Sequence, residues 1–173
     1  TTGDLTGQNV LSTDITVTYD PAVLTPLANP TSGVTMGAVA TSNGGGRKLT
    51  TGNLSPGTLH ISVFGAEVMQ GGGELVNLNF TVVGMPGTSS ALTFTLFKYN
   101  EFSPCTTNTN GSVTVIPGSI AGTVTYGNAI GLPAAPRNVP SVLMSGAGSP
   151  SVSDTTGGAG TYSLTGFGAG SYT

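Results

Sequence analysis

The sequence predicts an all-β protein built as a β-sandwich. Short segments in which apolar and polar residues alternate recur along the chain, and Gly, Pro and Asn separate them. That pattern is typical of strands joined by turns in a sandwich. The composition agrees, because 28 Thr and 28 Gly stand against only three Glu and two Lys, so β-branched residues and turn formers outnumber good helix formers.

The clearest strand lies at residues 76–82, between the glycines of 71–73 and the turn residues of 84–87. Its apolar face holds Val76, Leu78, Phe80 and Val82, and its polar face holds Asn77, Asn79 and Thr81. A period of two is the pattern of a strand with one face on a core and the other in water. We expect this strand to be central in its sheet.

Weaker or shorter strands follow the same alternation. They are expected at residues 10–19, 34–36, 48–50, 59–64, 91–97 and 112–115. In residues 91–97 the alternation directs Leu92, Phe94 and Leu96 inward and Phe97 outward, and Phe64 also faces outward. The predicted core includes Tyr19, Leu24, Leu78, Phe80, Val82 and Phe94.

The residue pattern of the sequence changes near Ile116-Pro117-Gly118, and these three residues are typical of a short linker. We therefore expect one domain at residues 1–116 and a second at 117–173. The second should have strands at 120–126, 139–144 and 161–164, and a fourth that begins at 170–173. Three whole strands are few for an independent core.

The low charge excludes several classes of partner. Only 6% of the residues are charged and the net charge is −3, so no basic patch is available for nucleic acid. No apolar run reaches the roughly 20 residues of a membrane-spanning helix, and no signal peptide is visible. Cys105 is the single cysteine, which excludes an internal disulfide; we expect a buried or inert thiol, with an intermolecular disulfide as the alternative. The surface, rich in Thr and Ser, suits an extracellular or cell-surface protein.

No catalytic, cofactor-binding or metal-binding residue is predicted. The single histidine, His60, should face solvent on its strand, without a nucleophile and an orienting acid in reach. The carboxylates are scattered, and none of them forms the closely spaced run of a calcium loop, although a calcium site made of backbone carbonyls stays open. Gly44–Gly46 precedes a strand and not a helix, so a hairpin loop is expected there and not a phosphate loop.

Three asparagines fit the acceptor pattern for N-linked glycans. They are Asn53, Asn79 and Asn110, each followed two residues later by Ser or Thr. The alternation directs Asn79 outward. Chance matches are common in a chain with this much Thr and Ser.

Three motifs of the first domain resemble the cohesin family. They are Tyr19-Asp20-Pro21-Ala22-Val23-Leu24, the Gly-rich turn and strand from Gly71 to Phe80, and Asn110-Gly111-Ser112-Val113-Thr114-Val115. The resemblance implies a jelly-roll or Ig-like sandwich, similar in fold to some carbohydrate-binding modules. It also implies a non-catalytic module that binds dockerin partners noncovalently through a sheet face. No short motif marks that face, so no binding residue is implied.

The second segment looks like a prealbumin-like domain of the collagen-binding-protein B or carboxypeptidase regulatory type. The resemblance rests on Gly118-Ser119-Ile120-Ala121-Gly122-Thr123-Val124, Gly160-Thr161-Tyr162-Ser163-Leu164 and Gly170-Ser171-Tyr172-Thr173. Two departures matter. The cohesin-like pattern usually has an earlier strand before the one that ends in Tyr-Asp-Pro, and the prealbumin-like pattern usually continues beyond its Gly-x-Tyr strand.

The resemblances and these departures lead to three hypotheses of function, of which the third, an enzyme fragment, lacks a recognisable nucleophile and base. The first is an extracellular structural subunit, non-catalytic, whose copies complement each other's sheets head to tail with their terminal strands, as in a filament. The second is a binding module, either a cohesin that captures a dockerin-like partner or a carbohydrate-binding sandwich. The absence of Trp disfavours glycan binding, since sugar rings stack on exposed aromatic side chains and only Phe64 and Phe97 are expected to face outward.

Overall fold

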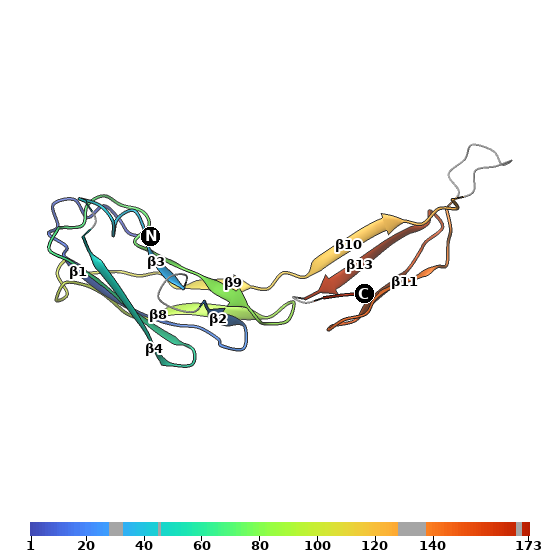
Figure 1. Ribbon diagram of the computed structural model, residues 1–173, viewed down its shortest axis with the longest axis horizontal. Coiled ribbons are helices and arrows are strands. Elements are labelled where there is room, and N and C mark those ends of the chain that lie inside the picture. Colours follow the sequence, from blue (N-terminus) through green and yellow to red (C-terminus); the bar gives the residue numbers. More distant parts are fainter. Residues whose placement is uncertain (28–32, 45, 128–137, 169–170) are drawn as a thin grey trace. The chain divides into compact units, whose positions relative to one another are not determined.

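The computed structural model describes residues 1–27, 33–44, 46–127, 138–168 and 171–173. The chain divides into two compact units, which are treated separately below. The first unit comprises Thr1–Gly84 and Ser89–Thr114, and the second comprises Met85–Thr88 and Val115–Thr173. The described residues are strands, turns and loops, so the all-β prediction is confirmed (Figure 1).

An antiparallel sheet of five strands forms the larger layer of the first unit. Its order is β4 (Lys48–Ser55), β5 (Thr58–Phe64), β1 (Ser12–Thr18), β8 (Ser89–Tyr99) and β9 (Gly111–Thr114). The strand β1 is central, because it pairs with β5 along one side and with β8 along the other. The predicted strand at 10–19 therefore has no gap beside it in this sheet.

The second layer consists of two short strand pairs. β2 (Leu24–Pro26) pairs with β7 (Phe80–Val82), and β3 (Val34–Met36) pairs with β6 (Val76–Leu78). The core lies between this layer and β1 and β5, whose inward side chains are almost fully buried: Ile15 is 2% exposed and Ile61 is 0% exposed.

The prediction that residues 76–82 form the central strand is wrong. The segment is divided into β6 and β7, and each of them has a single strand partner. The alternation of apolar and polar residues is real, but alternation reports one buried face and not the number of neighbours in the sheet. Ser12–Thr18 shows the same alternation and occupies the central position.

The six residues expected in the core differ in how deeply they are buried. Tyr19 and Leu24 are in the core, at 9% and 1% exposure. Leu78, Phe80 and Phe94 are half-buried. Val82 is 39% exposed, so its assignment to the core is wrong, because β7 has a neighbouring strand on one side only.

A β-bulge reverses the expected faces in β8. Phe94 pairs with Val17, but after a register shift between Phe94 and Leu96 the next pairs are Leu96 with Thr16 and Phe97 with Ile15. Because Ile15 and Val17 point into the core, Phe97 faces inward and Leu96 faces outward, opposite to the prediction. An inserted residue moves every side chain beyond it to the other face of the strand.

Arg47 connects two loops of the first unit by hydrogen bonds. Its buried guanidinium donates from Nη1 to the carbonyls of Ala40 and Ser42, both at 2.8 Å. Nη2 donates to the carbonyls of Glu67 and Val68, at 2.9 and 2.5 Å. Burial lowers the pKa of Arg47, and the charge of Glu67 opposes that shift.

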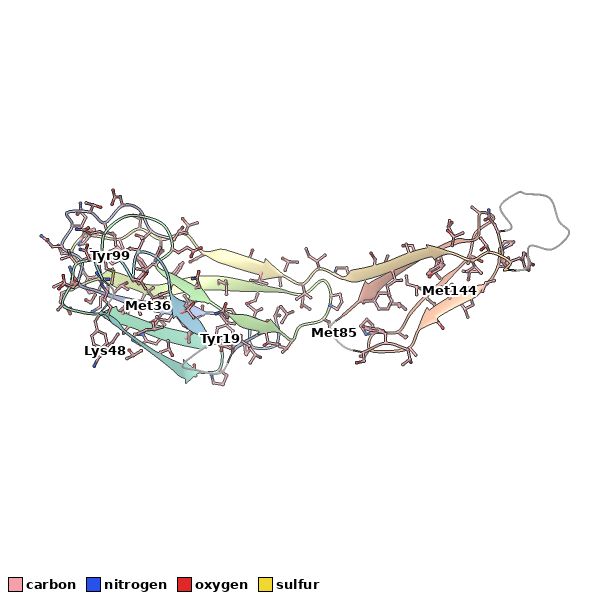
Figure 2. The ribbon with its side chains drawn as sticks, turned by 45° about the horizontal axis from the view of Figure 1, so that its top comes forward. Tyr19, Met36, Lys48, Met85, Tyr99 and Met144 are labelled. Atoms are coloured by element: carbon pink, nitrogen blue, oxygen red, sulfur yellow. The ribbon has the colours of Figure 1, made fainter. Side chains whose placement is uncertain are left out.

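The described part of the second unit contains two strand pairs. β10 (Gly118–Thr123) pairs with β13 (Thr161–Phe167), and β11 (Leu143–Gly146) pairs with β12 (Val152–Thr155). The predicted strand at 139–144 begins later, because Ser141 has a φ of 62° and interrupts the extended backbone. β12 was not predicted. Met144, labelled in Figure 2, lies on β11.

Both terminal segments pair within their own chain. Thr2 and Gly73 exchange two backbone hydrogen bonds, of 2.7 and 2.9 Å. Thr173 and Ala147 exchange two others, of 2.8 and 3.1 Å. These bonds occupy the terminal segments that the strand-exchange hypothesis needs for pairing with a neighbouring copy.

Candidate functional site

The side of the five-stranded sheet that faces away from the core belongs to the largest described sheet of the first unit. We call it the outer face and define it by one set of residues. They are Thr50 on β4, His60 and Ser62 on β5, Asp14 and Thr16 on β1, and Leu96 and Lys98 on β8. The pairing register places them side by side, since directly opposed residues of an antiparallel pair project from the same face.

A network of polar side chains crosses three strands on the outer face. Thr16 Oγ1 lies 3.1 Å from His60 Nδ1, and His60 Nε2 lies 3.3 Å from Ser62 Oγ. The Ser62 hydroxyl donates to the Asp14 carboxylate. The other oxygen of Asp14 lies 3.4 Å from Lys98 Nζ. Side chains held in this way present a fixed pattern of donors and acceptors to a partner.

The network has the residue types of a hydrolytic triad but not its arrangement. The only proton of the Ser62 hydroxyl goes to Asp14, so His60 Nε2 must donate to Ser62 and cannot accept its proton. In a triad the carboxylate instead orients the histidine through Nδ1, where this protein has Thr16. His60 therefore cannot activate Ser62 as a nucleophile in this geometry.

Lys98 is the best-paired charge of the outer face. Its ammonium also lies 3.5 Å from Glu101 and 5.3 Å from the centre of the Phe102 ring. Burial lowers the pKa of Lys98, but the hydrogen bonds and charges of Asp14 and Glu101 outweigh it, so the pKa is raised. Lys98 remains a cation at neutral pH.

Apolar side chains accompany the polar network. Leu96 is half-buried beside Thr16, and Phe64 is 43% exposed at the end of β5, opposite Lys48. Figure 2 shows Lys48 on β4 at the edge of the sheet. A flat surface that combines fixed polar groups with isolated apolar contacts has the composition of a protein-binding face.

A cavity of about 530 Å³ lies elsewhere in the first unit, between residues 1–8 and 104–109. Phe94, Phe97 and Tyr99 contribute to its lining; the rings of Phe97 and Tyr99 are 5.2 Å apart. Burial raises the pKa of Tyr99, whose hydroxyl bonds to Thr2. Cys105 also lines the cavity and is exposed, so of the expected buried or inert thiol the buried alternative is wrong.

The remaining sites predicted from the sequence are dispersed. Asn79 is exposed on the strand segment 76–82, and Asn110 is exposed while its side-chain carbonyl accepts a hydrogen bond from the Phe94 amide at 3.0 Å. The side chain of Asn53 lies outside the described residues. His60 is half-buried and hydrogen-bonded on the face where it was expected.

Sequence reasoning did not find the partners of His60. The alternation places Asp14 and Thr16 on one face of residues 10–19, and His60 and Ser62 on one face of 59–64. Only the register, in which Thr16 opposes His60 and Asp14 opposes Ser62, brings these four side chains together. Nothing local in the sequence specifies that register.

The described residues lack the features of two other kinds of site. They contain no group of three or more His, Cys, Asp and Glu side chains that could hold a metal ion. No helix in the described part of the chain is long and apolar enough to cross a membrane.

The chain matches one known protein family. Residues 3–120 match the family model of the cohesin domain. No curated protein matches the chain.

Three solved structures are similar to part of the chain. One contains the sixth cohesin of scaffoldin B from Acetivibrio cellulolyticus, in complex with a Cel5 dockerin; it is 22% identical, with 62% of this chain and 79% of that chain covered and a TM-score of 0.48. The CaDoc0917–CaCohA2 complex is 18% identical, with coverage of 62% and 80% and a TM-score of 0.49. The cohesin module of a Clostridium perfringens family 33 glycoside hydrolase is 15% identical, with coverage of 64% and 76% and a TM-score of 0.46.

Proposed function

The chain belongs to the cohesin family, and on that premise we propose that it is an extracellular, non-catalytic module that captures a dockerin partner through its outer face. The family match covers residues 3–120, which include every strand of the five-stranded sheet. The resemblance seen in the sequence implied a partner held noncovalently on a sheet face. The outer face is a sheet surface whose polar side chains are ordered by hydrogen bonds to one another.

The observation that carries the proposal is the cross-strand network from Thr16 through His60, Ser62 and Asp14 to Lys98. Residues on three different strands are fixed relative to one another before any partner arrives. Pre-organisation of this kind reduces the entropy lost on binding. The central Leu96 adds an apolar contact that a partner can bury.

The outer face also explains how a chain with few charges can be selective. Its charges are paired within the sheet, as Lys98 is with Asp14, so a partner must match the positions of hydroxyl and imidazole groups instead of a strong electrostatic field. Hydrogen-bonding groups left unmatched by a wrong partner would be costly to bury. Selectivity therefore arises from geometry.

The assignment to a binding module agrees with the arrangement around His60, which cannot serve Ser62 as a general base. It replaces the filament of strand-exchanged copies as the main function, because the terminal residues pair at Gly73 and Ala147 of the same chain. The prealbumin-like character of residues 117–173 stays a proposal that rests on their sequence motifs.

The experiment is a binding titration of the intact protein against a panel of purified dockerin modules. The parent should bind at least one of them. Thr50→Arg, at an exposed position on β4, and Leu96→Glu should each weaken that binding by about tenfold or more, because each places an uncompensated charge in the interface.

The matched control is Thr165→Arg, which places the same charge at an exposed position on β13 in the second unit. It should bind like the parent. Thermal melting of all three variants checks that the first unit is folded. Absence of binding to every dockerin, or equal binding by the outer-face variants and the control, would overturn the proposal.

A further inference from the structure

One glycine on the outer face lies inside a strand that does not need it. Gly52 is on β4 and pairs with His60 on β5, so its missing side chain would project from the outer face. A glycine within a strand costs stability, because it loses more backbone entropy on folding and has no side chain to pack. Glycine is usually required where the backbone is left-handed or where another group of the chain approaches closely.

Neither requirement applies to Gly52 among the described residues. Its φ lies outside the left-handed region, and the register shift of β4 falls beyond Asn53. A Cβ atom at this position would have no other atom of the described residues within 4 Å, its two chain neighbours apart. The other glycines of the described strands differ: Gly166 has a φ of 97°, and Gly111, Gly118, Gly122 and Gly146 have another residue within 4.0 Å of that position. The open space over Gly52 is therefore not required by the fold.

The hydrogen bonds of His60 keep this space open. An aromatic ring on a neighbouring strand can cover a glycine at the edge of a sheet, and His60 is the residue opposite Gly52. Its ring is instead held by Thr16, 3.1 Å from Nδ1, and by Ser62, 3.3 Å from Nε2. Because Thr16 is on β1, on the other side of β5 from β4, the ring is held away from Gly52.

The groups beside the space indicate which side chain of a partner fits there. Both ring nitrogens of His60 already have partners, so the imidazole offers its flat face and its carbon atoms. Thr50, two residues before Gly52 and on the same face, carries no charge. A flat, uncharged ring can lie on backbone that has no side chain and pack against the imidazole. Aromatic side chains are also enriched in the buried centres of protein interfaces.

We propose that an aromatic side chain of the dockerin partner lies on Gly52 against the ring of His60, which makes Gly52 a specificity-determining residue of the outer face. The inference rests on the proposed function, because it names what the partner places on that face. Any side chain at position 52 would occupy the space that the aromatic ring takes. The stability that glycine costs β4 is thus the condition for this contact.

The test is a double-mutant cycle with the dockerin of the panel that binds the parent most tightly. Gly52→Val should weaken its binding by about tenfold or more, because the added methyl groups fill the space that the ring requires. Each exposed aromatic residue of the dockerin is replaced in turn by Ala. One replacement should weaken binding to the parent by about tenfold or more but binding to the Gly52→Val protein by less than about threefold, because that contact is already lost.

Gly111→Val is the matched control. Gly111 is exposed on β9 of the same sheet, and it pairs with Leu92, two residues from the buried Ser90. Its side chain would therefore project from the opposite side to the outer face. The Gly111→Val protein should bind the dockerin like the parent.

Thermal unfolding gives a second readout that needs no partner. Gly52→Val should melt about 3 °C or more above the parent, because valine favours a strand and meets no obstacle in the described chain. A lower melting temperature would show that the fold needs this glycine and would overturn the inference.

The binding outcomes separate the inference from the proposed function. If Thr50→Arg and Leu96→Glu weaken binding but Gly52→Val does not, the inference alone is overturned. Additive losses for every aromatic residue of the dockerin would overturn it as well. If no dockerin binds the parent, the proposed function fails and the inference fails with it.

Discussion

Replacing Arg47 by Met should strongly destabilise the first unit. Met keeps much of the volume of the buried stem but removes all the donors that hold residues 40–42 against residues 67–68. Hydrogen bonds to a charged group contribute about 1.5–3 kcal/mol each, but water can replace those to carbonyls near the surface.

The magnitude follows from the burial of the four acceptors. Ala40 is fully buried, so its carbonyl would lose its partner without access to water, at a cost of about 1–3 kcal/mol. Ser42, Glu67 and Val68 are exposed or half-buried, and each lost bond there should cost about 0.5 kcal/mol after rehydration. We expect a total loss of about 3 kcal/mol, which corresponds to roughly 10–15 °C in melting temperature for a unit of this size.

The assay is thermal unfolding followed by circular dichroism, with Lys48→Met as the matched control. Lys48 is the next residue, and it is exposed, so its replacement also removes one positive charge but no buried partner. The control should unfold within about 0.5 kcal/mol of the parent. An Arg47→Met protein that melts together with the Lys48→Met control would refute the claim that the four carbonyl contacts stabilise the fold.

Three further predictions concern single side chains. Phe80→Ala should cost about 1–2 kcal/mol in urea unfolding, because the ring is only half-buried against Tyr19, with centroids 5.3 Å apart. A loss above about 4 kcal/mol, in the roughly 3–5 kcal/mol range of a fully buried Phe, would contradict that burial. Burial raises the pKa of Tyr99 above its unfolded value of about 10. The contribution of Tyr99 to stability is therefore complete below about pH 10 and is lost as the pH rises through the folded pKa. Tyr99→Phe should remove that loss of stability at alkaline pH, and a stability profile against pH that is the same as the parent's would contradict the prediction. Cys105 is exposed, so a thiol reagent should label it in the folded protein at close to the rate in urea, and strong protection would contradict its placement.

The fold class could be predicted from the sequence because it depends on local patterns. Alternation at residues 10–19 and 59–64 gave two of the strands and their buried faces. The order of strands in the sheet depends on pairing between distant segments, which alternation does not encode. For that reason the prediction that residues 76–82 are central in their sheet was wrong: β7 pairs with β2 and β6 with β3, all along one side of the segment.

The candidate site shows the same limit. The outward positions of Asp14 and His60 follow from periodicity, but their proximity follows from the register of β1 and β5. Leu96 and Phe97 lie on the opposite faces to those predicted because of a β-bulge, and no residue type in this stretch predicts that bulge. The contacts of Arg47 are not visible in the sequence either, because its four carbonyl partners come from two segments that only the folded chain brings together.

Backbone amide chemical shifts of the intact protein, recorded with and without a bound dockerin, test the central claim most directly. The account predicts that the largest changes fall on β1, β5 and β8, at Thr16, His60 and Leu96, and that residues 118–167 of the second unit are unaffected. Changes concentrated away from the five-stranded sheet, with Thr16, His60 and Leu96 unmoved, would contradict it.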